Sequence, residues 1–392
     1  MSEGPMPAPD TASLDHCARM VAKIRDEIDL AGGRLRFDRY MDLALNAPAL
    51  GYYRAPLHRF GAGGDFVTAP ELSPLFARCV ARQVAEILDL TGAFEVCEAG
   101  AGSGRLCVQL LAALAPLGYE RVHYCILEPS ADLRARQREL LEAEAPGALD
   151  RVRWLDGLPG EGFRGVIIAN ELLDALPVRR FRSTDTGILE AYVEWRDHRL
   201  GWRFDAPDDE RLAQAVDEIQ GILGRSFPQG YTSELGFQRS AWVRSAGASL
   251  SRGAMLIFDY GYPLAEYYHP QRTEGTLKCF FRHFAHDDPF LYPGIQDISA
   301  HVEFSSLADA ADEAGLDLGG FTNQAEFLLA TGLLDQCRDF DPLADDYASL
   351  TGQIKRLTLP GEMGELVKVI GLTRGMRAGL SGFSGRDLRD RL

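Results

Sequence analysis

Short apolar runs recur along the chain, separated by stretches of helical periodicity. The runs are four to eight residues long and do not alternate strictly with polar residues, which is typical of strands covered on both faces. They lie at 94–99, 122–128, 152–155, 165–170, 254–260 and 366–373. Because helical patterns separate these runs, we expect an α/β fold built on a mostly parallel, doubly wound sheet.

The N-terminal part of the chain predicts helices. Residues 12–31 form an amphipathic pattern that ends at a pair of glycines, and a second short helix begins within 34–54. A loop rich in glycine and proline, 61–74, then leads to a helix over 74–89.

An insertion separates the fourth and fifth apolar runs. Its first part predicts an antiparallel hairpin that turns near 197–199, followed by a helix around 208–223. The stretch 261–300 is irregular and rich in Tyr, His and Pro. The predicted domains are an N-terminal helical extension at 1–60, a core at 61–174 and 251–380, and an α+β insertion at 175–250.

Composition narrows the function classes. The 46% hydrophobic and 25% charged fractions of the 392 residues are those of an ordinary globular protein. A net charge of −16 disfavours binding to nucleic acid, and no apolar run approaches the ~20 residues that span a bilayer, so no membrane insertion is expected. The seven cysteines form no CxxC pair, and residues 1–11 have no apolar signal core, so we expect a cytoplasmic, bacterial-type chain with unpaired thiols.

A glycine-rich motif, EAGAGSG, directly follows the first predicted strand and precedes an apolar helix. Glycines let the backbone approach a ligand closely, and the helix start supplies free N–H groups. The last slot of a dinucleotide fingerprint would fall on Arg105 or Cys107, so that fingerprint does not fit. The motif instead resembles the first motif of class I S-adenosylmethionine methyltransferases; a turn without a ligand is the alternative. Its candidate residues are Glu98, Gly100, Gly102 and Gly104.

Two later strand ends add acidic side chains. Glu128 ends the second run, where a carboxylate can accept two hydrogen bonds from a ribose diol. Asp156 ends the third run and could accept from the adenine amine, although it could equally open a turn. The other cofactor-binding candidates at these two strand ends are Pro129, Ser130, Gly157 and Leu158, and Asn170 at the end of the fourth run is a further one.

The fourth run ends in Asn170 and Glu171, with Asp174 three residues further on. Ligands of open α/β sheets bind at the carboxyl ends of strands, so this polar group is aimed at the site. Glu171 and Asp174 would share one side of a helical turn. The alternative is an asparagine cap followed by first-turn acids, which does not explain the placement of Glu171.

The chain as a whole resembles the MidA-like S-adenosylmethionine-dependent methyltransferases. The matching stretches run in order from about residue 34 to 373 and include GDFVTAPELSPLF, EAGAGSGRL, ANELLDALPVRRF, PFLYPGIQDISAHVEF and PGEMGELVKVIGL. The family often has Tyr-His where this chain has Asn46-Ala47. The resemblance implies a class I Rossmann-like core with a helical and β-rich elaboration, and S-adenosylmethionine as cofactor. For the mitochondrial members it also implies methylation of an arginine on a subunit of respiratory complex I.

The resemblance also suggests roles at the acceptor. Arginine is always protonated, so a buried carboxylate can grip the guanidinium and aim one nitrogen at the methyl group. Glu171 resembles the first acid of the paired-carboxylate loop in protein arginine methyltransferases, and Asp174 is its candidate partner. Tyr260, in the Asp259-Tyr260 pair after the fifth run, and His301 are candidate acceptor contacts; a structural histidine is the alternative for His301.

Two further groups of residues bear on a lid and on a metal site. Asp65, Phe66 and the Thr68–Glu71 segment, with Pro70 as a cofactor contact, would form a lid, unless they are a crossover loop. The Cys279, His283 and His286 group matches no common zinc spacing, so no metal is expected.

Two other functions stay open at this level. A small-molecule methyltransferase would need an enclosed pocket, whereas a protein acceptor needs an open groove over Glu171. A non-catalytic chaperone that assists assembly while retaining the cofactor is the third reading. The hairpin of the insertion could also mediate a homodimer.

Overall fold

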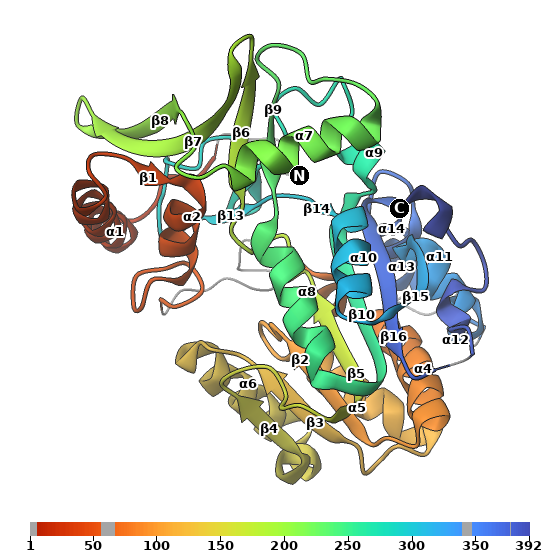
Figure 1. The fold of residues 1–392 in the computed structure, drawn as a ribbon. Helices are drawn as coiled ribbons and strands as arrows, with labels where there is room; N and C mark the ends of the chain where they lie inside the picture. The colour runs from red at the N-terminus through yellow and green to blue at the C-terminus, as the bar shows by residue number, and fades with distance from the viewer. Residues whose placement is uncertain (1–5, 56–66, 339–346, 377) are drawn as a thin grey trace. The chain divides into compact units, whose positions relative to one another are not determined.

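The computed structural model describes residues 6–55, 67–338, 347–376 and 378–392. The chain divides into two units. Figure 1 labels their helices and strands and colours them by residue number. Unit 1 comprises Met1–Phe66, Asp174–Arg239 and Leu264–Glu303, and unit 2 comprises Val67–Leu173, Ser240–Pro263 and Phe304–Leu392.

Unit 2 contains a mostly parallel sheet, as the apolar runs predict. Its strands follow the order β15 (Asp317–Asn323), β16 (Val367–Arg374), β10 (Leu250–Tyr262), β5 (Phe163–Asn170), β2 (Glu95–Ala99), β3 (His123–Leu127) and β4 (Val152–Leu155). Strands β10, β5, β2, β3 and β4 run parallel, whereas β16 is antiparallel to both of its neighbours. The carboxyl ends of the five parallel strands therefore lie at one edge of the sheet.

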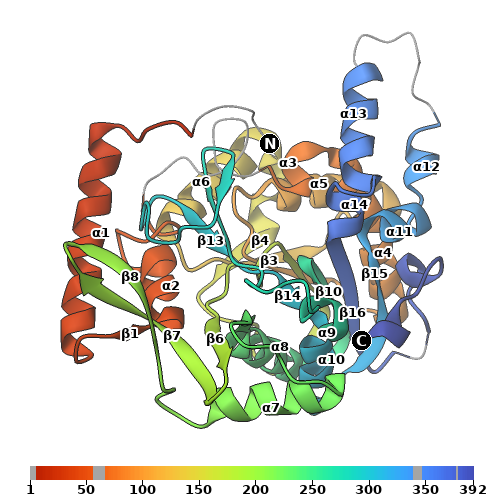
Figure 2. The same cartoon turned by 90° about the horizontal axis from the view of Figure 1, so that it is seen from above.

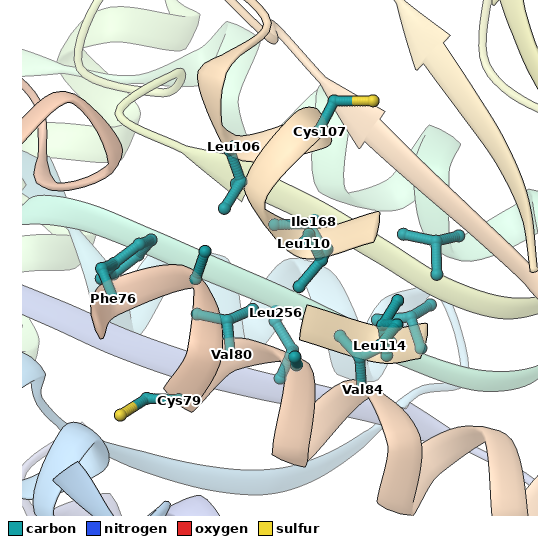
Figure 3. Packing of buried hydrophobic residues seen from close by; sticks show 14 of the residues in the cluster. Phe76, Cys79, Val80, Val84, Leu106, Cys107, Leu110, Leu114, Ile168 and Leu256 are labelled. Atoms are coloured by element: carbon teal, nitrogen blue, oxygen red, sulfur yellow. The ribbon is translucent and has the colours of Figure 1, made fainter. Parts of the chain in front are cut away.

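Helices α4 (Pro74–Thr91) and α5 (Arg105–Leu114) supply much of the core of unit 2. Ser73 caps α4 by accepting a hydrogen bond from the Leu75 N–H, and Gly92 ends the helix in the left-handed conformation. Apolar side chains of both helices pack with Ile168 of β5 and Leu256 of β10 (Figure 3). Burying each such side chain stabilises the fold by about 1.5–3 kcal/mol. In chain order, the α-helices of unit 2 are α3 (Ala69–Leu72), α4 (Pro74–Thr91), α5 (Arg105–Leu114), α6 (Ala131–Glu144), α8 (Phe237–Ser249), α10 (Phe304–Glu313), α11 (Gln324–Ala330), α12 (Leu333–Gln336), α13 (Tyr347–Thr358) and α14 (Met363–Leu366).

Unit 1 contains two antiparallel sheets. The first joins β1 (Leu35–Arg36), β7 (Gly187–Arg196), β6 (Arg179–Thr184) and β9 (Thr232–Leu235), with β8 (Arg199–Asp205) paired to β7. The second has the order β12 (Phe284–His286), β11 (Lys278–Phe281) and β13 (Asp297–Ser299). The remaining elements of this unit are α1 (Thr11–Leu30), α2 (Phe37–Asn46), α7 (Arg211–Leu223), α9 (Leu264–Tyr267) and β14 (Val302–Glu303).

Pairing between β1 and β7 explains how unit 1 is assembled. Leu35 lies opposite Val193, so the N-terminal segment shares a sheet with the hairpin of the insertion. Figure 2 shows α1 and α2 beside this hairpin. The segment predicted as the N-terminal extension and residues 175–239 of the predicted insertion thus belong to one unit, together with 264–303. The hairpin turns at Asp197 and His198, which both adopt positive φ.

Within the described part of the chain, no helix has the length and hydropathy needed to cross a membrane.

Candidate cofactor and acceptor sites

The glycine motif forms the loop between β2 and α5. Gly100, Gly102 and Gly104 have φ values of 70°, 53° and 86°, a region that disfavours other residues. A Cβ atom at Gly100 would stand 2.8 Å from Leu172 Cδ1, and one at Gly104 would stand 3.1 Å from Gln137 Cγ. The backbone conformation therefore favours glycine at all three positions, and neighbouring side chains leave little room for a Cβ at Gly100 and Gly104. The start of α5, whose first N–H groups have no partner within the helix, follows directly.

Glu98 lies in β2 just before this loop and is buried. Its Oε2 accepts a hydrogen bond from the Tyr124 hydroxyl at 2.6 Å. Burial raises the pKa of Glu98 to about 7; the nearby Glu128 charge also raises it, whereas the Tyr124 hydrogen bond opposes the shift. Glu98 could be predicted from the sequence, whereas Tyr124 could not, because it lies within an apolar strand and no motif marks it.

Glu128 follows β3, and its carboxylate is fixed by the start of α6. Its Oε1 accepts from the Ser130 N–H at 2.9 Å, and the Gln137 amide lies 3.5 Å from its Oε2. The Ser130 hydroxyl also caps α6 by accepting from Leu133 N at 3.4 Å, and the Arg134 Nε donates to the Glu128 carbonyl. Pro129 thus lies in a turn between Glu128 and Ser130, which are both fixed by hydrogen bonds.

Asp156, Gly157 and Leu158 follow β4. The Asp156 carboxylate is 96% exposed and pairs with Arg134 Nη2 at 2.7 Å. Trp154, near the end of β4, points its indole N–H at Gln137 Oε1, 2.8 Å away. The adenine contact of Asp156 stays a prediction.

Helix α3 connects the glycine loop with the predicted acceptor clamp. The Gln109 amide donates to Pro70 O at 3.1 Å, and the Ser103 hydroxyl donates to Glu71 Oε1. On its other side, the Ala69 N–H lies 3.4 Å from Glu171 Oε1. Helix α3 lies in the segment that is predicted to form a lid. The other two lid candidates, Asp65 and Phe66, lie outside the described residues.

Glu171 directly follows β5 with a φ of 49°, which is uncommon for a residue other than glycine. Its N–H donates to Phe258 O at 2.8 Å, and the Asn170 amide lies 3.4 Å from its Oε1. Strained backbone of this kind is concentrated at functional sites. The conformation of Glu171 is therefore a reason to consider this residue functional, and its role at the acceptor stays a prediction.

Asp259 and Tyr260 lie on β10, the neighbour of β5. The buried Asp259 carboxylate accepts from Leu173 N at 2.7 Å and from Tyr260 N at 2.9 Å. This carboxylate therefore holds the turn after Glu171. Glu171 and Tyr260 come from adjacent strands of the same unit.

Asp174 and His301 belong to unit 1, where Arg239 links their main chains. The buried Arg239 guanidinium donates to Asp174 O at 3.2 Å, to Ala300 O at 2.7 Å and to His301 O at 2.5 Å. Ala300 N also donates to Asp174 O at 3.0 Å, and His301 N donates to the Thr276 hydroxyl at 3.0 Å. These bonds hold the backbone; the proposed roles of the two side chains stay predictions.

The cysteine and histidine residues considered for a metal lie in the small sheet of unit 1. Cys279 on β11 is buried and lies opposite His286 on β12. In the ranges that the structure describes, no group of three His, Cys, Asp or Glu side chains could hold a metal ion. All seven cysteines are free thiols.

Comparison with known proteins gives consistent matches. A family model described as "Putative S-adenosyl-L-methionine-dependent methyltransferase" matches residues 79–322. The protein named protein arginine methyltransferase NDUFAF7, mitochondrial, is 27% identical in Danio rerio over 337 residues, covering 78% of this chain and 74% of the relative. The human protein of the same name is 28% identical over 333 residues, covering 77% and 70%.

A solved structure covers almost the whole chain. It is a crystal structure of a Burkholderia thailandensis protein bound to S-adenosyl-homocysteine, with 44% identity and a TM-score of 0.94. The match covers 99% of this chain and all of that one.

Proposed function

Because the chain belongs to the family of S-adenosyl-L-methionine-dependent methyltransferases, we propose that it methylates an arginine side chain of a protein. The class I methyltransferase fold and the S-adenosylmethionine cofactor expected from the sequence are both confirmed. What we propose beyond this is the identity of the methyl acceptor, an arginine side chain.

The residues after β2 and β3 fit this cofactor. Three glycines with positive φ give a loop that leaves room for the amino-acid end of a ligand, and the start of α5 adds N–H groups. The fixed Glu128 carboxylate suits a ribose diol. S-adenosylmethionine supplies an electrophilic methyl group on a sulfonium.

The Glu171 carboxylate carries the proposal for arginine. It follows β5 at the carboxyl edge of the sheet, and the Ala69 and Asn170 N–H groups lie 3.4 Å from one of its oxygens. A carboxylate held in this way can pair with a guanidinium and turn one nitrogen toward the methyl group. As that nitrogen forms its bond to the methyl carbon, the sulfur–carbon bond breaks, and the nitrogen then loses a proton to water. The names of the mitochondrial relatives support this acceptor, and a subunit of respiratory complex I is the first candidate protein.

The test compares the wild type with E171Q and with E142Q, a matched change on the exposed face of α6. Each protein is incubated with S-adenosylmethionine and peptides that differ only in carrying arginine or lysine, and methylated residues are identified by mass spectrometry. We expect methylarginine with the wild type and E142Q, and a loss of about 100-fold or more with E171Q.

Cofactor binding is measured in parallel by calorimetry with S-adenosylhomocysteine. We expect E171Q to keep its affinity to within about twofold, because the carboxylate acts on the acceptor. Full activity of E171Q would overturn the clamp. Methylation of small molecules without any methylarginine in peptides or in complex I preparations would overturn the arginine acceptor.

A further inference from the structure

Gln137 occupies an unusual position on α6. It lies in the polar run LRARQREL, yet its side chain is completely buried. A buried amide is stable only when its donors and acceptor have partners, so the surroundings of Gln137 define what it does.

Both ends of the Gln137 amide make hydrogen bonds. Its Nε2 donates to the Gly102 carbonyl at 2.9 Å and lies 3.5 Å from Glu128 Oε2. Its Oε1 accepts from the Trp154 indole N–H at 2.8 Å. Since an indole N–H can only donate and a carbonyl oxygen can only accept, these partners admit one orientation of the amide.

The three partners lie at the carboxyl ends of three different strands of unit 2. Gly102 lies in the loop after β2, Glu128 follows β3, and Trp154 lies near the end of β4. Each of these strand ends carries residues assigned above to the cofactor. The aliphatic part of Gln137 also packs against the glycine loop, because a Cβ at Gly104 would stand 3.1 Å from its Cγ.

We propose that Gln137 is a positioning residue of the cofactor site, which fixes the glycine loop, the Glu128 carboxylate and the end of β4 relative to one another through a single amide. The inference rests on the cofactor site and not on the arginine acceptor. It can therefore fail while the proposed function stands, and the reverse is also true.

The chemistry of the three partners requires an amide at this position. Methionine has a similar size but would leave the Gly102 carbonyl and the Trp154 N–H without this partner. A glutamate would place a carboxyl oxygen where the amide nitrogen now lies, next to the Gly102 carbonyl oxygen and the Glu128 carboxylate. In its ionised form this oxygen would be repelled by both. Protonation of that carboxyl group would restore a donor.

The first experiment measures S-adenosylhomocysteine binding by calorimetry for the wild type, Q137M and Q83M. Gln83 is the matched control: it is equally buried in unit 2, donates to Glu86 at 3.0 Å and accepts from Gly382 N at 2.7 Å, away from the cofactor loops. We expect Q137M to weaken binding about tenfold and Q83M to change it less than about twofold. Melting temperatures without ligand show whether the two variants lose similar stability.

The second experiment uses Q137E, whose binding is compared with the wild type at about pH 6 and about pH 8. We expect the affinity loss relative to the wild type to be at least about threefold larger at the higher pH, because the introduced carboxyl ionises there. A merely structural role would not produce this profile. Should Q137M fail to fold, this pH dependence decides the question.

Two results would overturn the proposal. One is a Q137M variant that binds S-adenosylhomocysteine within about twofold of the wild type. The other is a Q137E variant whose loss of affinity is the same at both pH values. Binding by the wild type itself is the control for the cofactor site.

Discussion

Glu98 carries a carboxyl group into the interior of unit 2, where a tyrosine hydroxyl is its hydrogen-bond partner at 2.6 Å. Burial there disfavours the charged form and raises the pKa of Glu98 to about 7, against an ordinary value of 4.5. Between these two values the folded protein binds a proton that the unfolded chain releases. Folding is therefore favoured at the acidic end of this range and loses stability as the pH rises toward 7.

Replacing Glu98 by glutamine should remove this pH dependence. The amide can still accept from Tyr124 but does not titrate. We expect the free energy of unfolding of the wild type, relative to E98Q, to fall by about 2–3 kcal/mol between pH 5 and pH 8. Urea unfolding at four pH values measures the difference. Parallel stability curves for the two proteins would show that Glu98 does not titrate in this range.

The backbone of Glu171 allows a second prediction for a single residue. Its φ of 49° costs energy for any residue with a Cβ, and a glycine avoids that cost. Replacing Glu171 by glycine or by alanine removes the same carboxylate. We expect E171G to unfold with a free energy about 1 kcal/mol higher than that of E171A, as measured by urea denaturation. Equal stabilities would mean that the turn relaxes when the carboxylate is lost.

Among the elements, the strands with continuous apolar runs were predictable and β15 was not. Its sequence, DLGGFTN, contains two glycines and reads as a loop. In the structure it pairs with β16, and a Cβ at Gly320 would stand 2.2 Å from the Phe383 ring. The glycine is therefore a packing requirement imposed by a distant aromatic residue, which no local pattern reports.

The candidate cofactor site shows the same division. Its glycine motif and its strand-end carboxylates could be predicted, because ligands bind at the carboxyl ends of parallel strands. Tyr124 and Gln137 could not, since a tyrosine in a strand and a glutamine in a polar helix are ordinary residues. Their importance comes from buried hydrogen bonds to Glu98 and Gly102 that only the folded chain creates.

Strands β6 and β7 are joined by a buried ion pair as well as by their ladder. Arg179 Nε and Nη2 donate to the two oxygens of the fully buried Glu190 at 2.6 and 2.7 Å, and Arg179 Nη1 also contacts Asp209 at 3.0 Å. A buried pair of this kind is costly to break, because the remaining charge keeps its burial and loses its partner.

We therefore expect R179M to lower the free energy of unfolding by about 3–5 kcal/mol. The double variant R179M/E190L removes both charges and should recover most of this loss. Thermal or urea unfolding of the two variants and the wild type gives the comparison. A double variant as unstable as R179M would indicate that packing, and not the unpaired charge, dominates.

The organisation of the whole molecule was harder to predict than its elements. Unit 1 is assembled from three segments that are far apart in the sequence. The two-residue strand β1, which pairs with β7, is too short to give a pattern. Local periodicity defines elements, but the choice of pairing partner depends on contacts between distant segments.

The net charge of the whole chain bears on the proposed acceptor. With 57 acidic and 41 basic residues, the protein has a net charge of −16. This charge attracts cationic peptides over long distances, and added salt screens the attraction. We expect kcat/KM for an arginine peptide with basic flanking residues to fall about fivefold or more between about 20 and about 200 mM salt. The same peptide with acidic flanks should show a weak or opposite dependence.

S-adenosylhomocysteine affinity should change less than about twofold over this range, because its contacts are short-ranged. Equal salt dependence for both peptides would mean that the acceptor is recognised by local contacts alone, without a contribution from the charge of the protein.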